Sequence, residues 1–252
     1  SGSPFVQWNR GLRLASHSLI WIAETDDTCC PTLLQNLYNS YVRNSAILSF
    51  SQSRFIAHDS SDIGSCLTYS SRHWKFAFDK DFAMDGRQFN TLYMAQACSI
   101  INSSAVLFSR DAFFNAGMAN ESMKFSGDWD MWIRIAEQGS VSYVSQELNQ
   151  FRCHQSTTRA NGVTPRMAAE HLACRIKALS SRELTHSEVV DVEWIIANFK
   201  IDGPPPLRMP IRSMVFSFSQ VKYYYRLMDN VPRISQMAWY LIGVLSFLVS
   251  LR

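Results

Sequence analysis

Apolar and polar positions at the start of the chain predict a helix that runs straight into a strand. Apolar residues recur every three or four positions over residues 5–16, which is the spacing of an amphipathic helix. Residues 19–23 are then apolar without alternation, as expected of a strand covered on both faces. The strand ends abruptly in the carboxylates of residues 24–27, so these acids are expected at its carboxyl end, where α/β sheets bind their ligands.

Helical and strand-like periods continue to alternate after this step. The patterns predict helices after Pro31, over residues 110–116 and from about residue 128 to Gly139, and strands at residues 46–50, 55–58, 100–108, 141–144 and 148–152. Residues 59–90 have little period and many polar side chains, which indicates a long loop of the kind that forms lids and binding segments. The order of the elements predicts an α/β class.

From Pro165 onward the pattern predicts helices alone. We therefore expect a domain over residues 1–160 and a helical extension over residues 161–252. The extension ends in an apolar run over residues 237–251, which is shorter than the ~20 residues of a membrane-spanning helix. Residues 207–252 are basic and aromatic ahead of this run, so they suit peripheral contact with a membrane. Packing against neighbouring helices, or a truncated membrane span, explains the same run.

Composition narrows the class of protein. The 252 residues are 47% hydrophobic and 18% charged, which supplies a core and argues against disorder. A net charge of +3, with no dense basic stripe, is too mild to predict a nucleic-acid partner. The six cysteines form no CxxC pair, which favours a reducing, cytoplasmic location. The first residues lack a signal-peptide pattern and an initiating Met, so we expect a fragment or a processed piece.

Three polar clusters are candidates for chemistry. Glu24, Asp26 and Asp27 repel one another, and their hard oxygen atoms suit Mg²⁺ or Mn²⁺, although a solvated acidic turn ahead of a helix explains them too. Asp128 falls at the start of a helix, where it is either a helix cap or a reactive carboxylate. His154 follows the last predicted strand, and a lone histidine of this kind is commonly structural.

Taken together, the three clusters resemble one family. WNRGLRLASHSLIWIAETDD is similar to the helix, strand and acidic motif of the inverting family-two glycosyltransferases with the GT-A fold. SGDWDMWIRIAEQG looks like their acceptor-side acidic helix, FRCHQST like their Arg-x-His-x-Ser segment, and INSSAVLFSRDAFFNAG like the strand and helix between. The resemblance covers Ser3 to about Thr158. It implies an incomplete GT-A fold, a mixed sheet flanked by helices, whose opening strand and base-gripping residues precede Ser1.

The resemblance also implies a donor side of the site. Asp27, helped by Asp26, is expected to hold the divalent cation, and His154 to reach the metal or the diphosphate. Glu24 stands where such enzymes often have another Asp and is assigned, with Asp26, to donor binding. Arg152 is expected to add positive charge near the phosphates. The cofactor is therefore Mn²⁺ or Mg²⁺.

The acceptor side follows in the same way. Asp128 matches the general base that takes the proton of the attacking hydroxyl. Asp130 is the rival for that role, and it lies about 200° around the helix from Asp128, so only one of the two faces the sugar. Trp129 is assigned to stacking against a sugar, or alternatively to the core. Ser104 is assigned to acceptor contact, or alternatively to hydrogen bonding at a strand edge.

The resulting hypothesis is an inverting, metal-dependent glycosyltransferase. It moves a sugar from a nucleotide-diphospho-sugar to a hydroxyl of a glycan or lipid-linked acceptor, in surface polysaccharide or glycoconjugate assembly. The protein is expected in the cytoplasm, with peripheral contact at the inner face of the cell membrane. Two alternatives stay open: a non-catalytic binding or scaffold module with a GT-A-like shell, and a metal-dependent phosphohydrolase built on Asp26 and Asp27.

Overall fold

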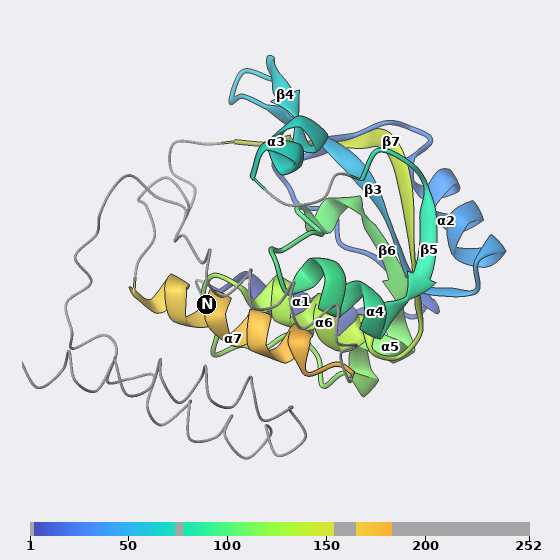
Figure 1. The fold of residues 1–252 in the computed structure, drawn as a ribbon. Coiled ribbons are helices and arrows are strands. Elements are labelled where there is room, and N and C mark those ends of the chain that lie inside the picture. The colour runs from blue at the N-terminus through green and yellow to red at the C-terminus, as the bar shows by residue number, and fades with distance from the viewer. Residues whose placement is uncertain (1–2, 74–77, 154–164, 183–252) are drawn as a thin grey trace, which may run out of the picture. The chain divides into compact units, whose positions relative to one another are not determined.

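The structure is a computed structural model that describes residues 3–73, 78–153 and 165–182 (Figure 1). The chain divides into two compact units, residues 1–161 with 170–182, and residues 162–169 with 183–252. The fold described below is that of the first unit. The predicted helix at residues 188–199 and the tail at residues 207–252 lie outside the described residues.

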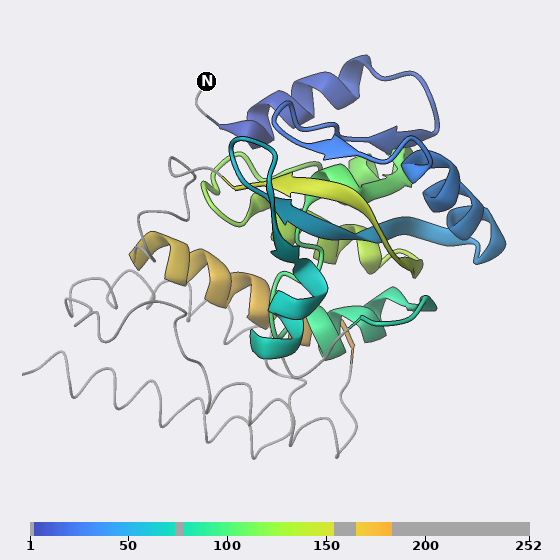
Figure 2. The ribbon, with the colours of Figure 1, turned by 90° about the horizontal axis from the view of Figure 1, so that it is seen from above.

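Seven strands form one mixed sheet. Its order is β1-β6-β3-β7-β2, with β4 paired to β3 and β5 paired to β7. The central strands β3 and β7 run parallel and side by side (Figure 2), and every other pairing is antiparallel. The bounds are β1 Leu19–Trp21, β2 Thr28–Cys29, β3 Ala46–Ile56, β4 Asp62–Ser65, β5 Phe82–Asp85, β6 Val106–Ser109 and β7 Ser140–Arg152.

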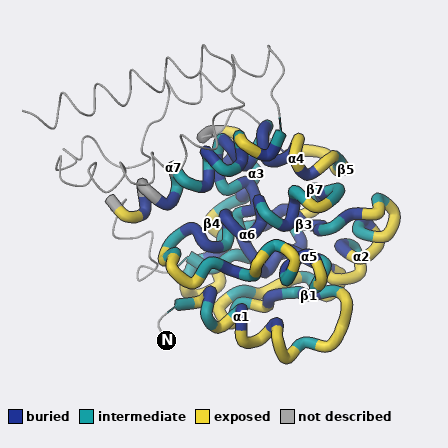
Figure 3. Tube along the Cα trace, turned by 90° about the horizontal axis from the view of Figure 1, so that it is seen from below, coloured by how far each residue is buried: buried dark blue, intermediate teal, exposed yellow. Residues whose placement is uncertain are grey.

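Helices cover both faces of this sheet. The helices are α1 Pro4–Leu14, α2 Leu33–Arg43, α3 Cys66–His73, α4 Gly86–Phe89, α5 Arg110–Asn115, α6 Gly127–Ala136 and α7 Pro165–Leu179, with a π-helical turn at Asn90–Met94 and a 3-10 turn at Ser103–Ala105. On one face, α2 buries Leu33 and Leu37 against the sheet. On the other face, α1, α4, α5, α6 and residues 170–179 of α7 share a larger core. Figure 3 shows that buried residues concentrate in β3 and α6.

The long central strands replace pairs of shorter predicted ones. Strands were expected at residues 46–50 and 55–58, but β3 continues through the serines between them. Ser51 and Ser53 are buried there because β7 pairs with β3 along its whole length, which compensates for their low strand propensity. The two strands expected at residues 141–152 likewise merge into β7.

The predicted loop at residues 59–90 is wrong. This segment holds β4, α3, β5 and α4, each of only four to eight residues, which is too short to show a clear period. Its aromatic residues belong to the core: Phe78 and Phe82 pack against Phe50 and Tyr143, with ring centroids 4.8–6.3 Å apart within this group.

The predicted class is confirmed, a mixed α/β sheet flanked by helices, and the helices expected at residues 5–16 and from residue 128 are α1 and α6. The strand expected to be covered on both faces differs. Within the described chain β1 lies at the end of the strand order, and only Ile20 of its three residues is buried. Residues 170–182, placed by the sequence in a separate extension, pack with the first unit. Across the described ranges, no helix combines the length and the apolar character needed to cross a membrane.

Candidate active site

The acidic turn, Glu24–Asp27, connects β1 to β2. A hydrogen bond of 3.4 Å from Asp27 N to Glu24 O closes it. Three donors from distant parts of the chain then fix the Asp27 carboxylate. Its Oδ2 accepts from Ser104 Oγ at 2.7 Å and from Asn102 Nδ2 at 2.8 Å, and its Oδ1 accepts from Arg152 N at 3.0 Å. Asp27 is therefore held in one orientation by the 3-10 turn and by the end of β7.

Ser104 links both ends of the acidic turn. Its hydroxyl donates to Asp27 and accepts from Glu24 N at 3.1 Å, while its carbonyl oxygen accepts from Trp21 Nε1 at 2.7 Å. The residue is 2% exposed. Both functions of this hydroxyl are thus used inside the protein. Of the two roles considered for Ser104, these contacts favour internal hydrogen bonding over acceptor contact.

Asn102 is the second organising residue. Its Oδ1 accepts from Ser104 N at 2.9 Å and so caps the 3-10 turn, which leaves its Nδ2 to donate to Asp27. In the orientation that satisfies both amides, the buried Asn149 of β7 accepts from the same Nδ2 at 2.8 Å. The side-chain amides of Asn149 and Asn102, hydrogen-bonded in series, therefore support the Asp27 carboxylate.

Arg152 ties the acidic turn to the loop after β3. Its Nε donates to Asp26 O at 2.7 Å, and one terminal nitrogen donates to Ala57 O at 2.9 Å, His58 O at 3.1 Å and Ser60 Oγ at 2.9 Å. These carbonyl and hydroxyl contacts give the guanidinium a role in holding the backbone. Its predicted role beside the phosphates stays a prediction.

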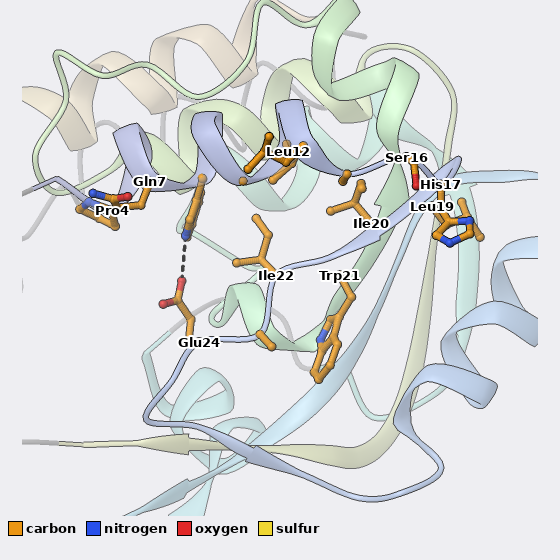
Figure 4. Close-up of a pocket in the computed structure, with 15 residues that line it drawn as sticks. Pro4, Gln7, Leu12, Ser16, His17, Leu19, Ile20, Trp21, Ile22 and Glu24 are labelled. Atoms are coloured by element: carbon orange, nitrogen blue, oxygen red, sulfur yellow. Dashed lines mark hydrogen bonds between the residues drawn. The ribbon is translucent and has the colours of Figure 1, made fainter. Parts of the chain in front are cut away.

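Glu24 faces α1 across a groove. The groove has a volume of about 670 Å³ and lies between α1 and residues 19–24. Figure 4 shows Ile20 and Ile22 pointing toward α1 and Trp21 pointing away from it. At one end of the groove, Glu24 Oε1 accepts from Trp8 Nε1 at 3.1 Å.

The surroundings of Glu24 shift the pKa of its carboxyl. Burial raises the pKa of the Glu24 carboxyl, and the hydrogen bond from Trp8 opposes this effect. The charges of Asp26, Asp27 and Asp128 each raise the same pKa further. Contacts link the two segments: Glu24 accepts from Trp8, the Trp8 ring packs edge-on against Phe5 with centroids 5.4 Å apart, and the Phe5 ring lies against Gly127, the residue before Asp128.

Asp128 lies in the first turn of α6. It is half-buried, and its Oδ1 accepts from Trp129 N at 2.8 Å. The preceding residue has to be glycine, because a β-carbon on Gly127 would lie 2.6 Å from the ring of Phe5 on α1. The two helices therefore approach closely at Gly127. This approach brings α1, and with it Trp8, against the helix that carries Asp128.

Two other predicted site residues turn away from this region. Trp129 is 3% exposed, and its Nε1 donates to Met94 O at 3.1 Å. Asp130 is 1% exposed and forms ion pairs with Arg134 at 2.6 Å and with Lys177. These contacts give both side chains a structural role between helices and provide no support for their assignment to substrate binding. His154 lies outside the described residues.

The donor set of the acidic turn suits a hard divalent cation in its chemistry. The acidic side chains of the turn are all carboxylates, and after burial, which is the larger cause, the charges of Asp26 and Asp27 also raise the pKa of Glu24. Within the described part of the chain, no three His, Cys, Asp or Glu side chains converge closely enough to hold a metal ion. The described residues therefore suit a hard cation by donor type and charge, and the metal itself stays a prediction.

Sequence reasoning missed three contributors to this site. The sequence pattern places Trp8 on the apolar face of α1 and Asn149 at a polar position of a strand, and neither pattern indicates a role in the site. Glu170 on α7, which binds the segment before α6, lies in a stretch assigned to the extension. The short polar run at residues 102–104, just before an apolar strand, was the only local signal that could have indicated a capped turn.

Comparison with known proteins adds evidence on the fold. No protein-family model matches the sequence, and no curated protein matches it either. Solved structures of the S. aureus glycosyltransferase TarS do match. A structure of TarS 1-349 in complex with UDP-GlcNAc is 12% identical with a TM-score of 0.55, and covers 79% of this chain and 52% of that chain.

Two further structures agree. A structure of S. aureus TarS is 10% identical with a TM-score of 0.60, covering 92% of this chain and 37% of that one. A complex of TarS 1-349 with UDP is 12% identical with a TM-score of 0.51, covering 79% and 50%. The chain spans about half, or less, of the length of these structures. At this level of identity the likeness concerns the fold alone: the mixed α/β sheet and flanking helices of this chain resemble those of the TarS structures.

Proposed function

We propose that this chain is the carboxyl-terminal part of an inverting, metal-dependent glycosyltransferase. It would transfer a sugar from a nucleotide-diphospho-sugar to an acceptor hydroxyl. The observation that supports the proposal is the set of contacts that links the acidic turn to the start of α6 within a glycosyltransferase-like fold: Glu24 binds Trp8, Trp8 packs on Phe5, and Phe5 lies against Gly127, next to Asp128. A transferase needs both a site for the leaving diphosphate and a base for the attacking hydroxyl, and these two segments supply one each.

In this proposal Asp128 is the general base. It accepts the proton of the acceptor hydroxyl while the hydroxyl oxygen forms a bond to the anomeric carbon, and the bond from that carbon to the diphosphate oxygen breaks. Asp128 is half-buried at the start of α6, with one oxygen held by Trp129 N. This geometry orients the carboxylate, and backbone N–H groups of the helix start stabilise its ionised form.

The acidic turn is the proposed donor side. Asp26 and Asp27 would hold Mn²⁺ or Mg²⁺, which when bound neutralises charge on the leaving diphosphate. Asn102, Ser104 and the backbone of Arg152 keep Asp27 in one orientation before any ligand arrives. Such preorganisation lowers the cost of ordering the site when the donor binds.

UDP-GlcNAc is the first donor to test, because TarS is solved in complex with it and with UDP. The acceptor is proposed to be a glycan or a lipid-linked saccharide, as expected for surface polysaccharide or glycoconjugate assembly. Since the acceptor is unidentified, water can replace it in the assay. Release of UDP from UDP-GlcNAc in the presence of MnCl₂ then reports turnover, and other nucleotide sugars can be screened in the same way.

Asp128→Asn in the full-length protein is the decisive variant. We expect it to lower the turnover by about 10²–10⁴-fold, the range that general-base catalysis contributes, with unchanged circular dichroism. Asp111→Asn is the matched control, because Asp111 is an exposed aspartate in the first turn of α5. Equal turnover of the Asp128 variant and the wild type would refute the assignment.

The alternatives make different predictions in the same preparation. A non-catalytic module predicts no heat in calorimetry with MnCl₂ and any nucleotide sugar, whereas the transferase predicts metal-dependent binding. A phosphohydrolase built on Asp26 and Asp27 predicts phosphate release from simple esters. The transferase predicts a nucleoside diphosphate as the product instead.

We also propose that the protein acts in the cytoplasm, with residues 207–252 in contact with the inner membrane face. The support for this lies in the basic, aromatic and apolar composition of that segment. Flotation with anionic liposomes, with and without the residues after Gly203, tests it. Identical partitioning of the two chains would remove the membrane contact from the proposal.

A further inference from the structure

The carboxylate of Glu170 accepts hydrogen bonds from three successive backbone N–H groups just before α6. Glu170 Oε2 accepts from Phe125 N at 2.8 Å, Ser126 N at 3.1 Å and Lys124 N at 3.2 Å, and its Oε1 accepts from Lys124 N at 3.0 Å. Glu170 is 8% exposed. Hydrogen bonds to an ionised acceptor are among the stronger ones in proteins, and here they all hold one segment of backbone.

This contact holds the segment that leads into α6. Ser126 occupies the N-cap position of α6, but its side chain makes no capping bond. Glu170 binds the N–H of Ser126 and those of the two residues before it, all of which precede the first helical residue, Gly127. The path of the chain into α6 is therefore set by a residue 44 positions or more away in the sequence.

The other residues around Asp128 are held by the same helix. The Trp129 ring lies against His171, with centroids 5.5 Å apart, and below the Arg175 guanidinium, at 5.7 Å. Asp130, the next residue of α6, forms an ion pair with Lys177 of the same helix, α7. Contacts from α7 thus fix the backbone before Asp128 and the side chains after it.

We infer that Glu170 is a positioning residue for Asp128, acting through the backbone of residues 124–126, and that residues 170–177 of α7 are part of the catalytic unit. The inference rests on the proposed function for the role of Asp128. A base must lie within hydrogen-bonding reach of the proton that it takes, and a displacement of about 1 Å costs on the order of 10²-fold in rate. Loosening the entry to α6 is therefore expected to affect turnover more than donor affinity.

Glu170→Gln in the full-length protein tests this step. The amide keeps the shape of the side chain but loses the charge and presents an NH₂ group to backbone donors. Hydrogen exchange of the amides of residues 124–126, followed by mass spectrometry, is expected to speed up by about tenfold or more, because each amide loses a charged acceptor. Release of UDP from UDP-GlcNAc with MnCl₂ is expected to show a kcat lowered by about 10–100-fold and a KM within about threefold of the wild type.

Glu137→Gln is the matched control. Glu137 follows α6 at its other end and accepts from Ser181 Oγ at 2.8 Å, so it is another glutamate that joins these helices. Its variant is expected to match the wild type in exchange at residues 124–126 and in kcat. An equal kcat loss in both variants would overturn the specific role of Glu170.

Two further results would overturn the inference. Unchanged exchange at residues 124–126 in the Glu170 variant would show that the carboxylate does not hold this segment. Faster exchange with an unchanged kcat would show that the segment does not position the base. Failure of the proposed function is a separate result, since it appears as absence of turnover in the wild type, and the exchange measurement still decides whether Glu170 holds the backbone.

Discussion

Removal of the Ser104 hydroxyl is expected to weaken both the fold and the acidic turn. Ser104→Ala deletes the hydrogen bond to Asp27 Oδ2 at 2.7 Å and the one accepted from Glu24 N at 3.1 Å. The residue is 2% exposed, so water cannot easily take the place of the lost group. The Asp27 carboxylate then keeps only the Asn102 amide and the Arg152 backbone N–H among the partners described above.

The magnitude follows from the two bonds. A hydrogen bond to a charged group contributes about 1.5–3 kcal/mol, and a neutral one about 0.5–1.5 kcal/mol. Asp27 Oδ2 keeps its bond from Asn102, so it is not left unsatisfied, whereas Glu24 N loses this partner. We therefore expect a loss of about 2–3 kcal/mol in the free energy of unfolding. At roughly 2–4 °C per kcal/mol for a domain of this size, the Tm falls by roughly 4–12 °C.

Urea denaturation followed by tryptophan fluorescence measures this loss. Ser103→Ala is the matched control, because Ser103 is also buried but its hydroxyl has no hydrogen bond to any described residue. The control is expected to change the free energy of unfolding by less than about 0.5 kcal/mol. A loss for Ser104→Ala no larger than that of the control would refute the reasoning, since the hydroxyl would then not support the turn.

Three further predictions concern the surroundings of the site. Because burial and neighbouring carboxylates raise the pKa of Glu24, its charge costs stability above that pKa, so Glu24→Gln is expected to raise the Tm at neutral pH and to lose the advantage as the pH falls toward 4.5. An advantage that is equal at every pH in thermal scans would contradict this. Gly127→Ala would place a methyl group in the ring of Phe5, at an expected cost of about 1–3 kcal/mol in urea unfolding, and an unchanged midpoint would show that the ring moves aside freely. Asp130→Asn leaves Lys177 without its buried partner; because that lysine is about one-third exposed, we expect a loss of about 2–3 kcal/mol, and full stability with lost turnover would instead make Asp130 the base.

The sequence predicts best the elements that are long and periodic. α1, α2 and α6 each have ten or eleven residues, and each shows an apolar stripe where the structure has a helix. β3 and β7 are harder, because serines interrupt their apolar runs and only the pairing between the two strands shows that each is continuous. Elements as short as β5 or α4 contain too few residues for a period, so they are found only through their contacts.

Within the site, the sequence identifies reactive groups better than it identifies their supports. The acidic turn and Asp128 stand out as carboxylates after a strand and at a helix start, and Trp8 and Phe5 of α1 link the two segments in the structure. Trp129 and Asp130 belong to the same motif, but which face of a helix is buried depends on its neighbours. Here residues 170–177 of α7 cover that face, and no pattern in the sequence indicates that this segment lies beside α6.

The acidic turn illustrates why such supports escape local patterns. The donors to Asp27 come from positions 75, 77 and 125 residues further along the chain. A turn of four residues with three carboxylates has no means of holding them together by itself, since their charges repel. The orientation of Asp27 therefore depends on the 3-10 turn and on the end of β7, and both must be folded before the site exists. A variant that disrupts the pairing of β3 with β7 is accordingly expected to disorganise the acidic turn, although it changes no residue of the turn.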